Sequence, residues 1–151
     1  MSVTQEIIKL KSELPEHVSL VAVSKYHPAS AIREAYEAGQ RIFGESQVQE
    51  LQRKHEELQL EGIQWHFIGH LQTNKVKYIA PYISLIHSVD SVKLLQENNK
   101  HGEKCGRKIN SLLHLKVARE DNKYRFSGIR RMEVTAVFAV VRCVVHCHQY
   151  R

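Results

Sequence analysis

The strongest constraint on the fold is a regular alternation between short apolar runs and longer amphipathic stretches. The apolar runs, which are typical of strands, lie at residues 19–25, 41–44, 65–69, 84–89 and 109–118. Parallel strands need a crossover connection, usually a helix, so this alternation predicts right-handed βαβ units. We therefore expect an α/β fold with about five parallel strands and flanking helices. Periodicity alone leaves open whether the sheet closes into a barrel.

Amphipathic patterns mark the expected helices. In the opening segment Ile7, Leu10 and Leu14 share one helical face, and a proline ends the run. Ser46 and Gln49 have the spacing of a capping box at the start of a later helix. Further helices are expected at residues 28–38, 46–58, 74–80 and 91–100.

The first strand ends in a lysine. Val21, Val23 and Lys25 share one parity, while Leu20 and Ala22 share the other, as expected of a parallel strand covered on both faces. Ligands of parallel α/β proteins collect at the carboxyl ends of strands. A partly desolvated amine there has a lowered pKa and can attack an aldehyde. The alternative is a solvated surface cation.

The third strand separates two kinds of side chain. Trp65 and Phe67 share one parity and His66, Ile68 and His70 the other, so one face offers apolar packing and the other imidazoles. These histidines are otherwise satisfied core or loop residues. A histidine pair without a nearby carboxylate is a weak metal signal, and no metal site is expected.

Small residues close three of the strands. Gly44 and Gly69 let backbone N–H groups approach a ligand, although turn geometry explains them equally well. Ser88 and Asp90 close the fourth strand, where capping of the next helix is the alternative to a ligand contact.

Charge, cysteines and the terminal segment limit the partners. Most of the net charge of +6 comes from five arginines at or beyond residue 125, so the body is nearly neutral and nucleic acid is not expected. Three cysteines without an export signal predict a cytoplasmic protein. The apolar run at 134–145 is too short to span a bilayer. The end of the chain also carries residues of the types that bind zinc, but no second ligand pair at a suitable spacing, so no metal is expected there. These residues are Cys143, His146, Cys147 and His148.

Four segments resemble one known family. VAVSKYHP, IREAYEAGQRIFGESQVQEL, IQWHFIGHLQTNKVKYIAP and LIHSVDSVKLL are similar to the pyridoxal phosphate (PLP) homeostasis proteins, the YggS/PROSC family, over residues 1–126. The resemblance implies the type III PLP fold, an alanine-racemase-like (β/α) TIM-type barrel. It also implies PLP held as a Schiff base on Lys25, in a carrier or regulator without enzymatic turnover. By the same resemblance the cofactor mouth is lined by Gly44, Ser46, His66, Gly69 and Ser88.

The chain also departs from this family. GESQVQE stands where the family has GENYVQE, so Ser46 and Gln47 replace an amide and an aromatic side chain, and Arg125 replaces a glycine. A complete barrel needs roughly 250 residues, and the family's later strands, which anchor the PLP phosphate, are not found. We therefore expect a partial barrel with weakened phosphate binding and a divergent segment at 127–151, as if from another reading frame.

Two alternatives to PLP homeostasis stay open. One is a racemase-like PLP enzyme, which needs a second acid/base group for which the sequence offers no candidate. The other is an inactive, truncated barrel. The expected assembly is a monomer or a weak homo-oligomer formed through the exposed sheet edge, because an unpaired edge invites association.

Overall fold

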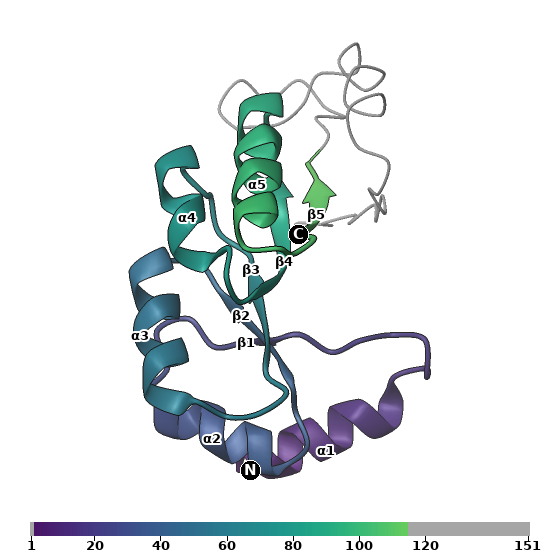
Figure 1. The fold of residues 1–151 in the computed structure, drawn as a ribbon. Coiled ribbons are helices and arrows are strands. Elements are labelled where there is room, and N and C mark those ends of the chain that lie inside the picture. The colour runs from purple at the N-terminus through teal and green to yellow at the C-terminus, as the bar shows by residue number, and fades with distance from the viewer. Residues whose placement is uncertain (1, 115–151) are drawn as a thin grey trace.

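The expected strands form one parallel sheet in chain order in the computed structural model, which describes residues 2–114 (Figure 1). Each strand pairs with the next, with register shifts between β3 and β4 and between β4 and β5. The α/β class and the parallel arrangement are thus confirmed. The strands are β1 (Ala22–Val23), β2 (Ile42–Glu45), β3 (Gln64–Phe67), β4 (Ile83–Val89) and β5 (Asn110–Leu113).

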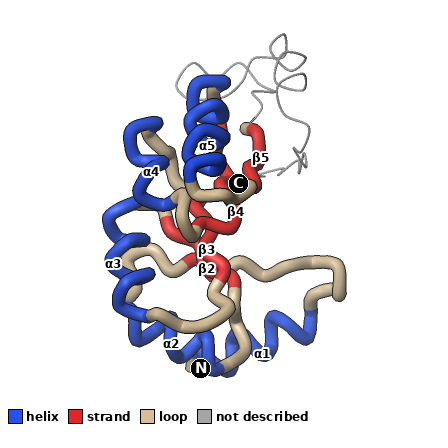
Figure 2. The backbone as a smooth tube through the Cα atoms, in the orientation of Figure 1, coloured by secondary structure: helices blue, strands red, loops and turns tan. Residues whose placement is uncertain are grey.

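Helices connect the strands and follow one another along one side of the sheet (Figures 1 and 2). Neighbouring helices pack together from α1 to α5. Within residues 2–114, no helix combines the length and apolar character needed to cross a bilayer. The helices are α1 (Val3–Glu13), α2 (Ala29–Glu37), α3 (Val48–Leu58), α4 (Val76–Ile79) and α5 (Val92–Lys104), with a 3-10 turn, η1 (Thr73–Lys75), before α4.

The core lies between the sheet and these helices. Phe43, Trp65 and Phe67 are buried there, and the rings of Phe43 and Trp65 lie 6.1 Å apart, centroid to centroid. Burying a side chain of this size contributes about 1.5–3 kcal/mol. Alternation along the strands therefore turns the aromatic face of β2 and β3 towards the helices, as the parity of Trp65 and Phe67 predicts.

The opposite face of the sheet differs from expectation. Val23 is 52% exposed, so the prediction that the first strand is covered on both faces is wrong for the described residues. The physical reason is that the helices cover one face only. A Cβ added at Gly44 would meet Val21 and Ile68, which shows that these three residues share the other face.

Two local predictions are also wrong. Helix α3 begins after Gln47 with no side-chain cap, so Ser46 and Gln49 form no capping box. Ser91, and not Asp90, caps α5, by accepting a hydrogen bond from the N–H of Leu94. The opening amphipathic helix is present as expected, with Ile7 buried and Leu10 42% exposed. The segment 127–151 and its cysteines and histidines lie outside the described residues.

Candidate functional site

The carboxyl ends of β2, β3 and β4 meet at one rim of the sheet. The backbone of Ser46, after β2, lies so close to Gly69, after β3, that a Cβ at residue 69 would collide with it. The hydroxyl of Ser88, near the end of β4, donates to the carbonyl of Gly69. Ser46 and Ser88 therefore both contact Gly69, and Gly44 is buried two residues before Ser46, on β2.

His66 pairs with a second histidine that the sequence reasoning missed. Its Nδ1 lies 3.0 Å from Nε2 of His87 on β4. Burial, and then the neighbouring His87, lower the pKa of His66 from 6.5 to about 4. His66 is consequently neutral at physiological pH. A signal existed, because both residues lie on adjacent predicted strands, but the strand register needed to pair them does not follow from sequence.

His70 and Asp90 lie outside this group. His70 Nδ1 is 3.3 Å from a carboxylate oxygen of Asp90, and the His70 side chain is half exposed. The sequence proposed helix capping for Asp90, whereas its carboxylate faces the loop that follows β3. Among residues 2–114 no group of three or more His, Cys, Asp or Glu residues is arranged to hold a metal ion.

Lys25 follows β1 in a turn at the edge of the sheet. Its side chain is exposed, and Nζ lies 5.9 Å from the centroid of the Tyr26 ring. The expectation of a partly desolvated amine is therefore wrong. The reason is its position: β1 is an edge strand of the described sheet and contains two residues, so only β2 flanks the turn.

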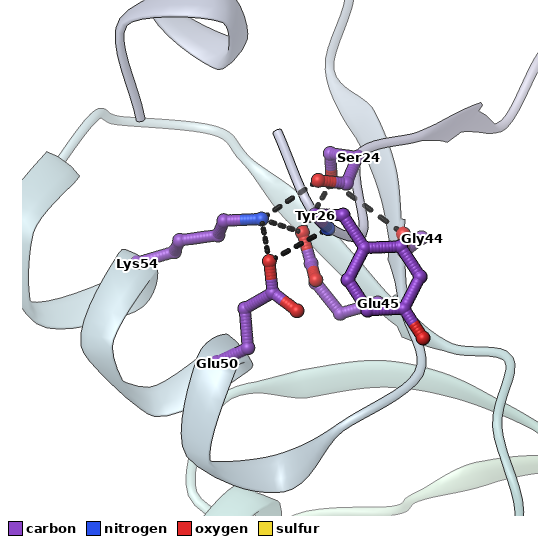
Figure 3. Close-up of polar contacts among 6 residues, drawn as sticks. All are labelled: Ser24, Tyr26, Gly44, Glu45, Glu50 and Lys54. Atoms are coloured by element: carbon purple, nitrogen blue, oxygen red, sulfur yellow. Dashed lines mark hydrogen bonds and ion pairs between the residues drawn. The ribbon is translucent and has the colours of Figure 1, made fainter. Parts of the chain in front are cut away.

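A buried ion cluster lies directly behind this turn (Figure 3). Lys54, on α3, is fully buried, and its Nζ donates at 2.7 Å to the carbonyl of Ser24 and to carboxylate oxygens of Glu45 and Glu50. The hydroxyl of Ser24 also donates to Glu45 at 2.6 Å. All three ammonium hydrogens thus have acceptors. We call Ser24, Glu45, Glu50 and Lys54 the Lys54 cluster.

The Lys54 cluster also holds the backbone after Lys25. The N–H of Tyr26 donates to Glu50 Oε1 at 2.8 Å, and Tyr26 has a φ of 66°, in the left-handed region that favours glycine. Burial raises the pKa of Glu50, but hydrogen bonds from Lys54 and from the Tyr26 N–H outweigh it and leave that pKa below its ordinary value. Glu50 is therefore ionised at neutral pH.

The sequence reasoning missed the Lys54 cluster, although a signal was present. Residue 54 is three positions after Leu51 and four before Leu58, so Lys54 lies in the buried stripe of α3. A lysine there needs acceptors, and Glu50, one turn earlier, is placed to supply one.

The sequence is similar to named proteins along most of its length, although no family model matches it. The pyridoxal phosphate homeostasis protein of Escherichia coli K12 is 39% identical over 130 residues, which cover 84% of this chain and 54% of that protein. The protein of the same name from Schizosaccharomyces pombe is 42% identical over 109 residues, 71% of this chain and 46% of that protein. The chain spans about half the length of the curated relatives it matches.

Solved structures agree in fold. PipY of Synechococcus elongatus, a COG0325 family member solved with PLP bound, has a TM-score of 0.78 and 40% identity, covering 89% of this chain and 63% of PipY. PipY without PLP gives a TM-score of 0.83. Alanine racemase from E. faecalis, with a TM-score of 0.64 and 17% identity over 83% of this chain and 34% of the racemase, shows the shared fold alone. The chain is therefore homologous to part of the pyridoxal phosphate homeostasis proteins, the YggS/PROSC family.

Proposed function

We propose that this chain binds pyridoxal 5′-phosphate through the amine of Lys25 and acts in PLP homeostasis, without catalytic turnover. The observation that carries the proposal is an accessible primary amine directly after the first parallel strand, on the edge where ligands of such sheets bind. PipY, which shares the fold and 40% of the aligned sequence, was solved with PLP bound. The relatives' names supply the homeostatic role.

The residues at the rim fit the reactive end of this cofactor. When bound, PLP supplies an aldehyde that condenses with a primary amine. Lys25 offers that amine in an exposed position, so the aldehyde can reach it without a rearrangement of the core. His66 is uncharged at neutral pH, so it adds no second positive charge to the edge of the sheet at which Lys25 lies. Gly44, Ser46, Gly69 and Ser88 are proposed to line the mouth, where Ser46 and Ser88 carry hydroxyls.

Cofactor titration tests the proposal. Adding PLP to the full chain should shift the cofactor's absorbance, and borohydride reduction should leave one added mass, located on Lys25 by peptide mapping. Lys25→Ala should abolish both signals, whereas Lys93→Ala, which removes an exposed lysine on α5, should keep them. Equal labelling of the wild type and Lys25→Ala would refute the assignment.

Pyridoxal, which lacks the phosphate, is an informative second ligand. The proposal rests on the amine of Lys25 and on no phosphate contact within residues 2–114. We therefore expect pyridoxal to label Lys25 about as well as PLP does, to within roughly threefold.

The proposal extends to location and assembly. We place the protein in the cytoplasm, as a monomer or a weak homo-oligomer that associates through an exposed edge of the sheet. The likeness to alanine racemase carries the fold alone and adds no support for racemisation. Incubation with L-alanine and PLP tests that activity directly, and formation of the D form would overturn a purely homeostatic role.

A further inference from the structure

We propose that Glu50 and Lys54 are positioning residues for Lys25, which fix the two peptide groups on either side of it. The inference rests on the proposed function, because it concerns the same lysine, and it assigns a role to a cluster that lies outside the predicted cofactor mouth.

Each peptide group next to Lys25 has its own partner in the Lys54 cluster. The peptide before Lys25 ends in the Ser24 carbonyl, which accepts a hydrogen bond from Lys54 Nζ at 2.7 Å. The peptide after Lys25 carries the Tyr26 N–H, which donates to Glu50 at 2.8 Å (Figure 3). Both partners come from α3, and the buried bond from Lys54 to Glu45 ties α3 to the end of β2. The orientation of the Lys25 backbone is therefore set by one helix.

The turn itself needs such a restraint. Residues 24–27 form a turn in which the N–H of His27 donates to the carbonyl of Ser24 at 3.1 Å. Its third position is normally glycine when φ is positive, yet Tyr26 occupies it with φ 66°. The Tyr26 side chain is 74% exposed and so contributes little packing to hold this conformation. The charged acceptor Glu50 compensates for the unfavourable backbone conformation.

Fixing this backbone matters for condensation. The neutral amine attacks the aldehyde carbon, a C=N bond forms, and one water leaves with the aldehyde oxygen. A misplacement of about 1 Å at a reacting group can slow a reaction on the order of 100-fold. Lys25 has a long and exposed side chain, so the restraint that the protein can supply acts on its Cα, through the two flanking peptides.

Substitution of Glu50 tests the role. Glu50→Ala removes the acceptor of the Tyr26 N–H, whereas Glu50→Gln keeps an oxygen in that place. Glu57→Ala, at an exposed position of the same helix, is the matched control. The readouts are the rate at which PLP becomes reducible on Lys25 and the hydrogen-exchange rate of the Tyr26 amide, both measured well below the unfolding temperature. Lys54→Met is unsuitable here, because it leaves two carboxylates without their cation and threatens folding.

We expect Glu50→Ala to slow attachment at Lys25 about tenfold and to speed exchange at Tyr26 by a similar factor, as loss of the charge-assisted hydrogen bond from the Tyr26 N–H implies. Glu50→Gln should keep both rates within about threefold of the wild-type rates. Glu57→Ala should react and exchange at the wild-type rates. A folded Glu50→Ala that reacts at the wild-type rate, or exchanges Tyr26 at the wild-type rate, overturns the positioning role alone. No attachment to wild-type Lys25 overturns the proposed function and this role together.

Discussion

Replacing Lys54 by methionine should destabilise the protein severely, because the change removes the cation that pairs with two carboxylates in the buried Lys54 cluster. Glu45 is fully buried with one carboxylate oxygen lacking a partner among the described residues, and the Glu50 side chain is 11% exposed. Methionine occupies most of the space of the lysine methylene groups, so the loss of stability is mainly electrostatic. Breaking a buried ion pair in this way costs about 3–5 kcal/mol, a large part of the stability of a typical domain.

Urea unfolding measures the effect. The chain has one tryptophan, Trp65, which is 2% exposed in the core, so its fluorescence reports the unfolding of the sheet. Lys93→Met, at an exposed position on α5, is the control and should change the free energy of unfolding by less than about 0.5 kcal/mol. The double variant Glu45→Gln/Lys54→Met should lose less than the two single losses summed, by about 1 kcal/mol or more.

Acidification distinguishes charge from packing. Loss of Lys54 removes contacts that lower the pKa of Glu50 and leaves burial, which raises it, so Glu50 should take up a proton more readily in the variant. The deficit of Lys54→Met should therefore shrink between about pH 7 and about pH 5. A packing defect would give the same deficit at both values. Two results would refute the reasoning: a loss below about 1 kcal/mol at neutral pH, or a larger deficit in acid.

Three further predictions concern the rim and the sheet. Burial and His87 hold the pKa of His66 at about 4, so the unfolded chain takes up a proton between about pH 4 and 6.5 that the folded chain does not. His66 alone should therefore lower the stability of the wild type by about 2 kcal/mol from pH 7.5 to 5. His66→Gln should lose less over that range in urea unfolding, while the exposed control His17→Gln should match wild type. Gly69→Ala forces a Cβ against the Ser46 backbone and should cost about 1–3 kcal/mol by thermal unfolding; an unchanged midpoint would contradict the close approach. If β1 mediates weak association, Val23→Lys should abolish concentration-dependent light scattering, and a wild type that stays monomeric would remove this expectation.

The order and type of the elements could be predicted because they depend on local periodicity. A short apolar run between helical stretches specifies a parallel strand wherever it lies, and the alternation of Trp65 and Phe67 identifies the face that packs on the helices. Helix caps were less predictable. Ser46 and Asp90 have suitable side chains, but tertiary contacts with Gly69 and His70 place them elsewhere.

The site could be predicted only where it depends on strand order. Strand ends of a parallel sheet must meet, which brings Ser46, Gly69 and Ser88 together. The His66 contact with His87 depends instead on register, and β3 and β4 shift register next to His66. The exposure of Lys25 depends on which elements lie beside β1. The residue pattern of that one strand does not reveal its neighbours.

The three bonds of Lys54 have a consequence for which residues can occupy that position. Its acceptors come from the end of β1, the end of β2 and the preceding turn of α3, so they surround the nitrogen from separate directions. A tetrahedral ammonium suits such a shell, whereas guanidinium is flat and directs its hydrogens within a plane. Arginine would preserve the charge and still be a disruptive replacement, so tolerance at residue 54 is governed by the shape of the donor.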